Sequence, residues 1–429
     1  MPELRDIEEA RQRIRDRVYL SPCARSETMS RRCGAVTFFK LENLQMTGSF
    51  KERGALNKIL QLDPDARRRG VIAASAGNHA QAVAYHAAQA GIPATIVMPR
   101  RTPLVKVANT RQHGAEVILH GNDFDEAYAY SLEIEHERGL VAIHPFDDED
   151  VIAGQGTIAL ELLEQVPDLQ MVLVPIGGGG LISGIAVAIK ALRPRVKVIG
   201  VEAAACPAMK RSLEEGKRVT VGSGTTIADG IAVKKPGALT LEYVKRFVDD
   251  VVTVDEEEIA NAVLVLLEQE KTVTEGAGAV TLAALYNRHV RAARGKRVVM
   301  ILSGGNIDVN ILSRIIERGL AKDGRLVRLE VQLPDEPGSL AALLAEVGLQ
   351  SANVIEVHHE RTFSDLGLAR VRVELTLETR GGDHARQLEA ALRERGFEAT
   401  PIWPQASRTA ASRRSRAAAR GSRRPGKPA

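Results

Sequence analysis

The chain has 429 residues, of which 44% are hydrophobic and 26% charged, with a formal net charge of +4. This composition is typical of globular proteins and excludes wholesale disorder, and at roughly 150 residues per domain the length predicts about three domains. No apolar run of about 18 residues occurs, so no membrane span is expected. The charged N-terminal segment lacks the apolar core of a secretory signal. Three scattered cysteines favour the reducing cytoplasm over a disulfide framework.

Short β-branched segments alternate with alanine-rich segments of helical character from residue 36 to residue 304. Strands are predicted at 36–42, 70–75, 94–99, 115–121, 140–145, 171–177, 196–202, 247–254 and 297–304. Helices are predicted at 51–61, 78–90, 103–113, 123–138, 156–165, 181–192, 256–270 and 276–289. The alternation predicts an α/β fold with largely parallel strands. So many strands favour two sheets over one.

The texture of the sequence changes after residue 325. Segments of alternating polarity and two helical segments predict a β-α-β-β-α-β order, which is a ferredoxin-like α+β arrangement. Asp335 is expected to cap the first of these helices, because its short carboxylate can accept an unpaired backbone N–H. Residues 322–324 form a predicted linker. The alternative to a separate domain is that the residues after 325 form an extra lobe of the preceding domain.

The last 25 residues, 405–429, form a basic tail with eight Lys and Arg and no acid. The +4 of the whole chain therefore becomes −4 when the tail is set aside, and the overall charge is no argument for nucleic-acid binding. With almost no large apolar residues, the tail is predicted to be disordered. A solubilising extension is favoured over a nucleic-acid or acidic partner.

Four successive glycines, Gly177, Gly178, Gly179 and Gly180, follow the strand at 171–177 and precede a helix. Glycines allow close backbone approach to an anion, and a helix N-terminus adds unpaired N–H groups, so we expect a phosphate cradle. The segment matches neither the P-loop nor G-x-G-x-x-G. Glu202 ends the next predicted strand, where a dinucleotide-binding fold has its ribose-binding acid. A dinucleotide site is therefore one alternative, and a tight turn without a ligand is the other.

Lys51 stands at the end of Thr47-Gly48-Ser49-Phe50-Lys51, where a turn leads into a helix. Such a lysine is either a solvated cation or a Schiff-base residue whose amine binds an aldehyde cofactor and later moves protons. A phosphate cradle that is not a nucleotide loop favours the second interpretation.

Polar residues also follow two further predicted strands. Ser75 to His79 bring a hydroxyl, an amide and backbone N–H groups to a helix start, which predicts a carboxylate or oxyanion site, with simple capping by Ser75 as the alternative. His79 is either a general base or structural.

Ser303 ends the predicted strand at 297–304, at the edge of the sheet where α/β folds place ligands. The alternative is that Ser303 only forms a turn. No zinc motif is present, so no metal is expected.

Seven motifs together resemble one family. They are KLENLQMTGSFKERGA (40–55), SAGNHAQAVA (75–84), AGQGTIALE (153–161), VPIGGGGLISG (174–184), ADGIAV (228–233), TEGAGA (274–279) and LSGGNID (302–308). This set is similar to the threonine/serine dehydratases, pyridoxal-phosphate enzymes with the fold of tryptophan synthase β. Residues 326–403 resemble an ACT regulatory domain. The resemblance implies a large lobe (1–47 and 149–321), a small lobe (48–148), and the ACT domain.

The resemblance also implies roles for the residues. Lys51 would bind pyridoxal 5'-phosphate, Gly177 to Gly180 its phosphate, and Asn78 its phenolic oxygen. Phe50 would lie against the ring, and Ser303 would meet the pyridine nitrogen without holding it protonated, which favours elimination over transamination.

For the substrate, the resemblance implies that Ser75 and the amides of Ala76, Gly77, Asn78 and His79 hold the carboxylate. Lys51 would take the α-proton. The implied reaction is elimination and deamination of L-threonine, and of L-serine, to 2-oxobutanoate or pyruvate and ammonia. The implied setting is isoleucine biosynthesis or catabolism.

Two other functions remain open. Serine racemases of this group resemble Ser-Ser-Gly-Asn-His and need a proton donor on the far face, whereas this chain has Ala76, whose methyl cannot transfer a proton. Their metal loop is only partly matched, because Cys206 and Ala208 follow Glu202 where a small residue and a carboxylate would stand. A nucleotide-dependent oxidoreductase would need the glycine cradle and Glu202 to hold a dinucleotide.

The ACT resemblance implies regulation by an amino acid or a nucleotide in a homo-oligomer, either a dimer or a tetramer. The expected effector site is the turn containing Asp335, Gly338 and Leu340, facing the strand start at Asn353 and Ile355. A branched-chain amino acid is the preferred effector.

Overall fold

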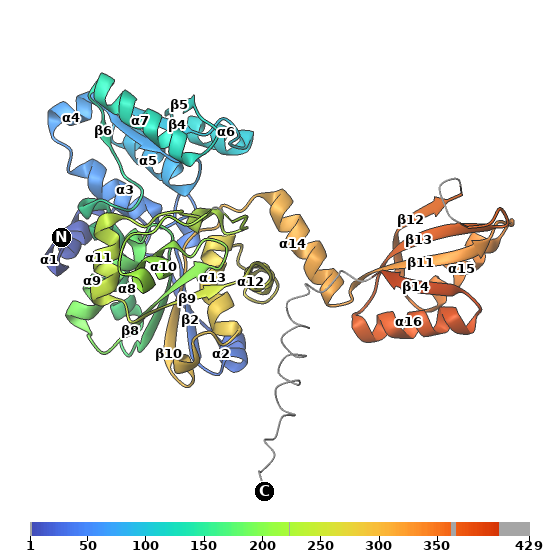
Figure 1. Ribbon diagram of the computed structural model, residues 1–429. Coiled ribbons are helices and arrows are strands. Elements are labelled where there is room, and N and C mark those ends of the chain that lie inside the picture. The colour runs from blue at the N-terminus through green and yellow to red at the C-terminus, as the bar shows by residue number, and fades with distance from the viewer. Residues whose placement is uncertain (1, 223, 362–365, 403–429) are drawn as a thin grey trace, which may run out of the picture. The chain divides into compact units, whose positions relative to one another are not determined.

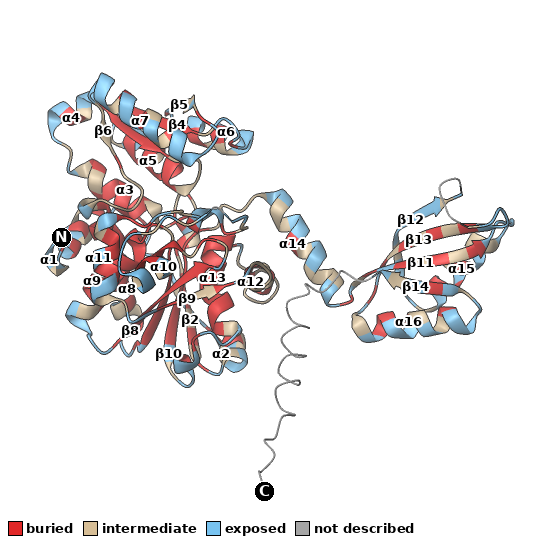
Figure 2. Cartoon of the chain, in the orientation of Figure 1, coloured by how far each residue is buried: buried red, intermediate tan, exposed pale blue. Residues whose placement is uncertain are grey.

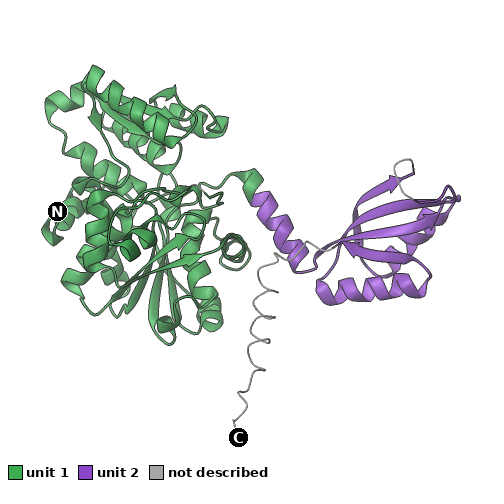
Figure 3. Ribbon diagram, in the orientation of Figure 1, with its two compact units in different colours: residues 1–311 green, residues 312–429 purple. Residues whose placement is uncertain are grey.

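The computed structural model describes residues 2–222, 224–361 and 366–402, and the chain divides into two compact units, residues 1–311 and 312–429 (Figure 3). The basic tail predicted at 405–429 lies outside the described residues. In the described part, none of the helices combines the length and the apolar character needed to cross a membrane.

The first unit alternates strands and helices (Figure 1). The strands are β1 Cys23–Ser26, β2 Val36–Leu41, β3 Val71–Ala74, β4 Ala94–Met98, β5 Glu116–Leu119, β6 Val141–Ala142, β7 Met171–Pro175, β8 Lys197–Ala203, β9 Asp250–Val254 and β10 Arg297–Leu302. The α-helices are α1 Leu4–Ile14, α2 Glu27–Cys33, α3 Lys51–Leu60, α4 Pro64–Arg69, α5 Asn78–Gln89, α6 Leu104–Gln112, α7 Phe124–Arg138, α8 Glu149–Gln165, α9 Gly180–Leu192, α10 Ala208–Glu215, α11 Ala238–Phe247, α12 Glu256–Gln269 and α13 Gly276–Tyr286. Three 3-10 turns add η1 Glu42–Leu44, η2 Asp229–Ile231 and η3 Arg291–Ala293.

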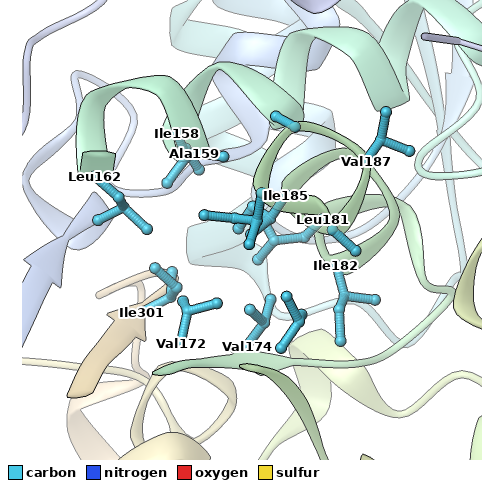
Figure 4. Close-up of a cluster of buried hydrophobic side chains, with 14 of the residues drawn as sticks. Ile158, Ala159, Leu162, Val172, Val174, Leu181, Ile182, Ile185, Val187 and Ile301 are labelled. Atoms are coloured by element: carbon cyan, nitrogen blue, oxygen red, sulfur yellow. The ribbon is translucent and has the colours of Figure 1, made fainter. Parts of the chain in front are cut away.

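A six-stranded sheet forms the centre of the larger lobe, in the order β1-β2-β10-β7-β8-β9. Only β1 is antiparallel to its neighbour. All five residues of β7 are buried, as expected for a parallel strand covered on both faces. Its neighbours β8 and β10 are also mostly buried (Figure 2). Side chains of α8 and α9, among them Ile158 and Ile185, pack against Val172 of β7 and Ile301 of β10 (Figure 4).

A four-stranded parallel sheet, β5-β4-β3-β6, forms the centre of the smaller lobe. It draws its core from α5 and α7, with Val83 and Ile134 among the buried residues. Two sheets, both largely parallel, confirm the predicted α/β class.

Every strand predicted between residues 36 and 304 is present, whereas the observed helices differ more from the predicted ones. Helix α8 begins at Glu149, seven residues before the predicted start at 156, because Asp148 caps it by accepting the N–H groups of Asp150 and Val151. Helices α2, α4, α10, α11 and α14 (Val309–Lys322) were not predicted. Most of these are short, and short helices carry little periodicity.

The strand order brings separate loops together. Strands β7 and β10 pair in parallel, so the glycines after β7 and Ser303 after β10 leave the sheet at the same edge. Strands β3 and β6 also pair in parallel, which places Ser75 beside the segment that follows β6. Ligand sites of α/β folds form at such points, where neighbouring connections diverge.

A fully buried ionic cluster attaches α3 to the larger lobe. Arg53, on α3, pairs with Glu42 at 2.8 Å and with Glu161 of α8 at 2.6 Å, and Lys40 also donates to Glu161. Burial alone would raise the pKa of Glu42, but the charge of Arg53 lowers it below its ordinary value. Glu42 therefore stays ionised beside Arg53 inside the protein.

The second unit contains β11 Leu326–Pro334, α15 Ser339–Leu349, β12 Asn353–Glu360, β13 Arg370–Glu378, α16 Gly382–Glu394 and β14 Glu398–Ile402. Its antiparallel sheet has the order β12-β13-β11-β14, and alternate residues of β11 and β13 are buried under the two helices. The predicted β-α-β-β-α-β order is therefore present. The predicted cap is wrong, because Gly338 occupies the N-cap position of α15 and Asp335 accepts instead from Arg361.

Replacing Arg53 by methionine should lower the free energy of unfolding by about 3–5 kcal/mol, because it leaves the buried carboxylate of Glu42 without its ion-pair partner, while Glu161 keeps only Lys40. The matched control is Arg11→Met, which removes a more exposed pair with Glu164 on the same helix α8 and should cost about 1 kcal/mol or less. Urea unfolding of both variants measures the difference. Equal losses would contradict the proposed role of the buried cluster.

Candidate active site

A cavity of about 690 Å³ lies at the carboxyl ends of the parallel strands in the first unit. Every residue predicted to bind cofactor or substrate lines it: Phe50, Lys51, Ser75, Ala76, Gly77, Asn78, His79, Gly177, Gly178, Gly179, Gly180 and Ser303. Residues far apart in the sequence thus share one space.

Lys51 begins helix α3, with its side chain half-buried in the cavity wall. Its Nζ donates to the carbonyl of Pro145 at 2.7 Å and lies 5.3 Å from the centre of the Phe50 ring. Burial lowers the pKa of Lys51 to about 8, against the opposing attraction of Glu275. Roughly a tenth of the amine is therefore uncharged at pH 7, far more than for an ordinary lysine, and a nucleophile or base requires this uncharged form.

The turn before Lys51 is tied to the loop after β10. Phe50 N–H donates to the carbonyl of Ser303 at 3.1 Å, and Gly305 N–H donates to the carbonyl of Gly48 at 2.9 Å. Gly48 has a φ of +77°, and a Cβ there would lie 2.7 Å from Asn306. This close approach explains the glycine and fixes buried Ser303 beside Lys51.

The glycine segment joins β7 to helix α9, which begins at Gly180. A Cβ on Gly178 would lie 2.2 Å from the Phe146 ring, and Gly179 has a φ of +99°. Thr240 Oγ1 donates to the carbonyl of Gly178 at 2.6 Å. Contacts with Phe146 and Thr240 therefore fix the glycine segment. The N–H groups in the first turn of α9 remain available to an anion in the cavity.

Helix α5 starts at Asn78, so the amides of Ser75 to His79 stand at a helix N-terminus on the cavity wall. The His79 side chain is buried, and its Nε2 lies 2.7 Å from the carbonyl of Ile143. Because a carbonyl only accepts, Nε2 carries the proton. Burial lowers the pKa of His79 to about 3, so the imidazole is neutral, and its hydrogen bond to Ile143 favours the structural alternative.

Glu275 and Asn306 are site residues that sequence reasoning did not single out. Asn78 Nδ2 donates to Glu275 Oε1 at 2.8 Å, while Asn306 Nδ2 donates to Asn78 Oδ1 at 2.8 Å and to the carbonyl of Thr47 at 2.7 Å. This chain fixes the orientation of the Asn78 amide. Burial and nearby Asp229 raise the pKa of Glu275 to about 7.

Two sets of ion pairs connect the small lobe with the loop that follows α10. Lys106 pairs with Asp229 at 2.8 Å, and Lys234 pairs with Asp123 at 3.2 Å and with Asp125 at 3.0 Å. Lys106, Asp125, Asp229 and Lys234 also line the cavity. These charged residues were not predicted to belong to the site.

Glu202 serves the fold rather than a ligand. Its carboxylate accepts the N–H groups of Met209 at 2.8 Å and Lys210 at 2.9 Å, in the first turn of α10. The oxidoreductase hypothesis thereby loses its candidate ribose-binding acid. No cluster of potential metal ligands occurs among residues 2–222, 224–361 and 366–402.

The predicted effector residues do not meet within one chain. Asn353 pairs with Glu378 at one end of β13, whereas Pro334, just before the turn containing Asp335, Gly338 and Leu340, pairs with Arg370 at the other end. Eight strand positions correspond to about 27 Å. The expectation that the turn faces Asn353 and Ile355 is therefore wrong for a single copy.

Comparisons with known proteins agree with this site. The family described as "Pyridoxal-phosphate dependent enzyme" matches residues 14–304. The L-threonine ammonia-lyase of Thermotoga maritima is 52% identical over 398 residues, which cover 93% of this chain and 99% of that protein. A processed form of threonine deaminase isoform 2 from Solanum lycopersicum superposes with a TM-score of 0.70 at 38% identity, covering 73% of this chain and 86% of that one. Maize serine racemase gives 0.70 at 38% identity, covering 75% and 98%.

The residues present fit pyridoxal phosphate. A helix start preceded by glycines suits its phosphate, and a lysine with a lowered pKa suits its aldehyde. The cavity is large enough for a cofactor and a small amino acid.

The buried neutral state of His79 predicts a pH dependence of stability. As the pH falls below about 6.5, His79 becomes protonated in the unfolded chain. In the folded protein it stays neutral down to about pH 3. The free energy of unfolding should therefore fall by up to about 1.4 kcal/mol per pH unit from this residue. Urea unfolding at pH 7 and pH 5 should show a shallower slope for His79→Gln, whose amide can still donate to Ile143. An unchanged slope would show that His79 is protonated in the fold.

Proposed function

This chain belongs to the family of pyridoxal-phosphate dependent enzymes, and on that basis we propose that it is an L-threonine ammonia-lyase. It converts L-threonine to 2-oxobutanoate and ammonia, and L-serine to pyruvate and ammonia. The observation that carries the proposal is the presence of Lys51, the glycine segment, Ser303 and Ser75 to His79 around one cavity. The 52% identity to an L-threonine ammonia-lyase over nearly the whole chain supports it. The three cysteines, all free, are compatible with work in the cytoplasm.

Pyridoxal phosphate, when bound, supplies an electron sink that allows the α-proton of an amino acid to be removed. The amides of Gly177 to Gly180 would hold its phosphate at the start of α9. Asn78, held by Glu275 and Asn306, would donate an N–H to its phenolic oxygen, and Phe50 would pack against its ring.

The substrate is held by its carboxylate on Ser75 and the amides of Ala76 to His79, where the positive end of the α5 dipole favours a negative charge. Lys51 removes the α-proton, since its lowered pKa leaves part of the amine uncharged. Ser303 offers the pyridine nitrogen a neutral hydroxyl, which cannot hold it protonated as a carboxylate would. Loss of the β-hydroxyl and then of ammonia is thereby favoured over transamination.

Serine racemase is the second function compatible with the fold, given the likeness to the maize enzyme. Racemisation needs a proton donor on the face opposite Lys51. The chain has Ala76 next to Ser75 on the cavity wall, and a methyl group carries no exchangeable proton. The lyase reaction is therefore preferred.

The second unit acts as an ACT regulatory domain in this proposal. Its β-α-β-β-α-β order supports the assignment. Since the turn at Asp335, Gly338 and Leu340 lies far from Asn353 and Ile355 within one chain, the effector site requires two copies. Ile355 is 57% exposed on the outer strand β12, where a second chain can cover it. The exposed edge strand supports a homo-oligomer, and the proposed effector is a branched-chain amino acid.

Lys51→Ala should abolish ammonia release from L-threonine, because the base and the cofactor linkage are lost together. The control is Lys197→Ala, an exposed lysine at the start of β8 that pairs with Asp249 and should leave turnover unchanged. Steady-state ammonia formation from L-threonine and from L-serine measures both. Near-normal turnover in the Lys51 variant would refute the assignment.

Ending the chain after residue 322 should leave an enzyme with basal turnover but no effector response, because an effector acts only where it binds one arrangement better than another. Titrations of 2-oxo acid formation with isoleucine, valine and AMP test this expectation. A shortened enzyme that responds with an unchanged midpoint would place the effector site in residues 1–322 instead.

A further inference from the structure

The segment from Ile143 to Asp148, between β6 and α8, contacts nearly every part of the active site. The carbonyl of Pro145 accepts Lys51 Nζ at 2.7 Å, and the Phe146 ring packs against Gly178 so closely that no Cβ fits there. The carbonyl of Ile143 accepts His79. We call residues 143–148 the connecting segment.

Two aspartates extend these contacts to neighbouring helices. Asp147 accepts the N–H groups of Ala238, Leu239 and Thr240, which begin α11 and include the residue that donates to Gly178. Asp148 caps α8 and pairs with Lys58 of α3 at 3.0 Å. A change in the path of the connecting segment would therefore move both the lysine and the phosphate cradle.

His144 supplies the hydrogen bonds that bend the connecting segment. Its Nδ1 lies 3.2 Å from Phe146 N and 2.8 Å from Asp147 N. Backbone N–H groups only donate, so Nδ1 must carry a lone pair and the proton must be on Nε2. The imidazole thus replaces the side-chain oxygen that asparagine or aspartate uses to close a turn on the residues that follow.

The surroundings keep this imidazole neutral. Burial lowers the pKa of His144, the Lys51 ammonium lowers it further, and Asp147 and Asp148 act in the opposite direction. Its ring packs edge-on against Phe146, with centroids 4.7 Å apart, and against Tyr128 at 6.1 Å. Because Nδ1 already accepts two N–H groups, it is not available as a base for the substrate.

We propose that His144 is a positioning residue of the active site: its neutral imidazole, accepting at Nδ1, sets the Pro145 carbonyl against Lys51 and the Phe146 ring against the glycine cradle. The expected effect of His144 on turnover rests on the proposed function. The protonation state of His144 and the turn that it stabilises do not depend on the identity of the substrate.

The first test compares two variants. His144→Leu removes the acceptor and should lower kcat/KM for L-threonine by about 100-fold, the scale expected when a catalytic group is misplaced by about 1 Å. His144→Asn keeps an acceptor at the same place and should restore most of that loss. The dissociation constant for pyridoxal phosphate, titrated into the cofactor-free proteins, should rise in the leucine variant and stay near wild type in the asparagine variant.

A matched control comes from the second unit. His384 also accepts a backbone N–H at Nδ1, from Arg380 at 3.0 Å, and its Nε2 lies 2.8 Å from the carbonyl of Gln350. His384→Leu removes the same kind of bond outside the active site and should leave cofactor affinity unchanged. If both leucine variants weaken cofactor binding equally, the effect is general destabilisation and the proposal falls.

The second test measures the protonation of His144 in the wild-type protein. Nitrogen-15 NMR of histidine-labelled wild-type protein, assigned with His144→Asn, should show Nδ1 of His144 unprotonated and Nε2 protonated. A protonated Nδ1 would overturn the proposal, because the two backbone bonds could not exist. Equal losses of kcat/KM in the asparagine and leucine variants would also overturn it, since the imidazole would then act in some other way. If L-threonine is not a substrate, the proposed function fails, while the cofactor titration and the NMR measurement still decide the role of His144.

Discussion

The buried ion pairs of Arg53 fix the position on which the rest of the site depends. Helix α3 begins with Lys51 and carries Arg53 two residues later, where the guanidinium meets Glu42 and Glu161 inside the larger lobe. Buried charged side chains are costly unless they are paired, so α3 has little freedom to shift or rotate. Lys51 is therefore placed by electrostatics in the core and not by contacts within the cavity alone.

The sheets bring the remaining groups to that lysine. Parallel strands end at a common edge, so the glycines after β7 and Ser303 after β10 arrive together, as do Ser75 after β3 and Pro145 after β6. Hydrogen bonds between these loops then set their spacing, for example between Phe50 and Ser303. The amine of Lys51 sits among them with a pKa lowered to about 8, which is suited to both bond formation and proton transfer.

Much of this could be predicted because the signals are local. Four glycines between a strand and a helix, or a serine at a strand end, predict a ligand site from a few neighbouring residues. Glu275 could not be ranked as a site residue, since an acid matters there only because folding buries it against Asn78. His144 has the same limit, because its role depends on which nitrogen faces the backbone. The effector expectation failed for one chain because strand register, which places Asn353 opposite Glu378, is a tertiary property.

Chemical trapping tests most directly whether Lys51 binds pyridoxal phosphate covalently in this cavity, as proposed. The purified protein should absorb visible light, and borohydride should bleach that band while fixing the cofactor to its lysine. Peptide mass mapping should then find the pyridoxyl group on the peptide containing Lys51. A colourless protein that retains a dinucleotide, or a label on any other lysine, would contradict the account.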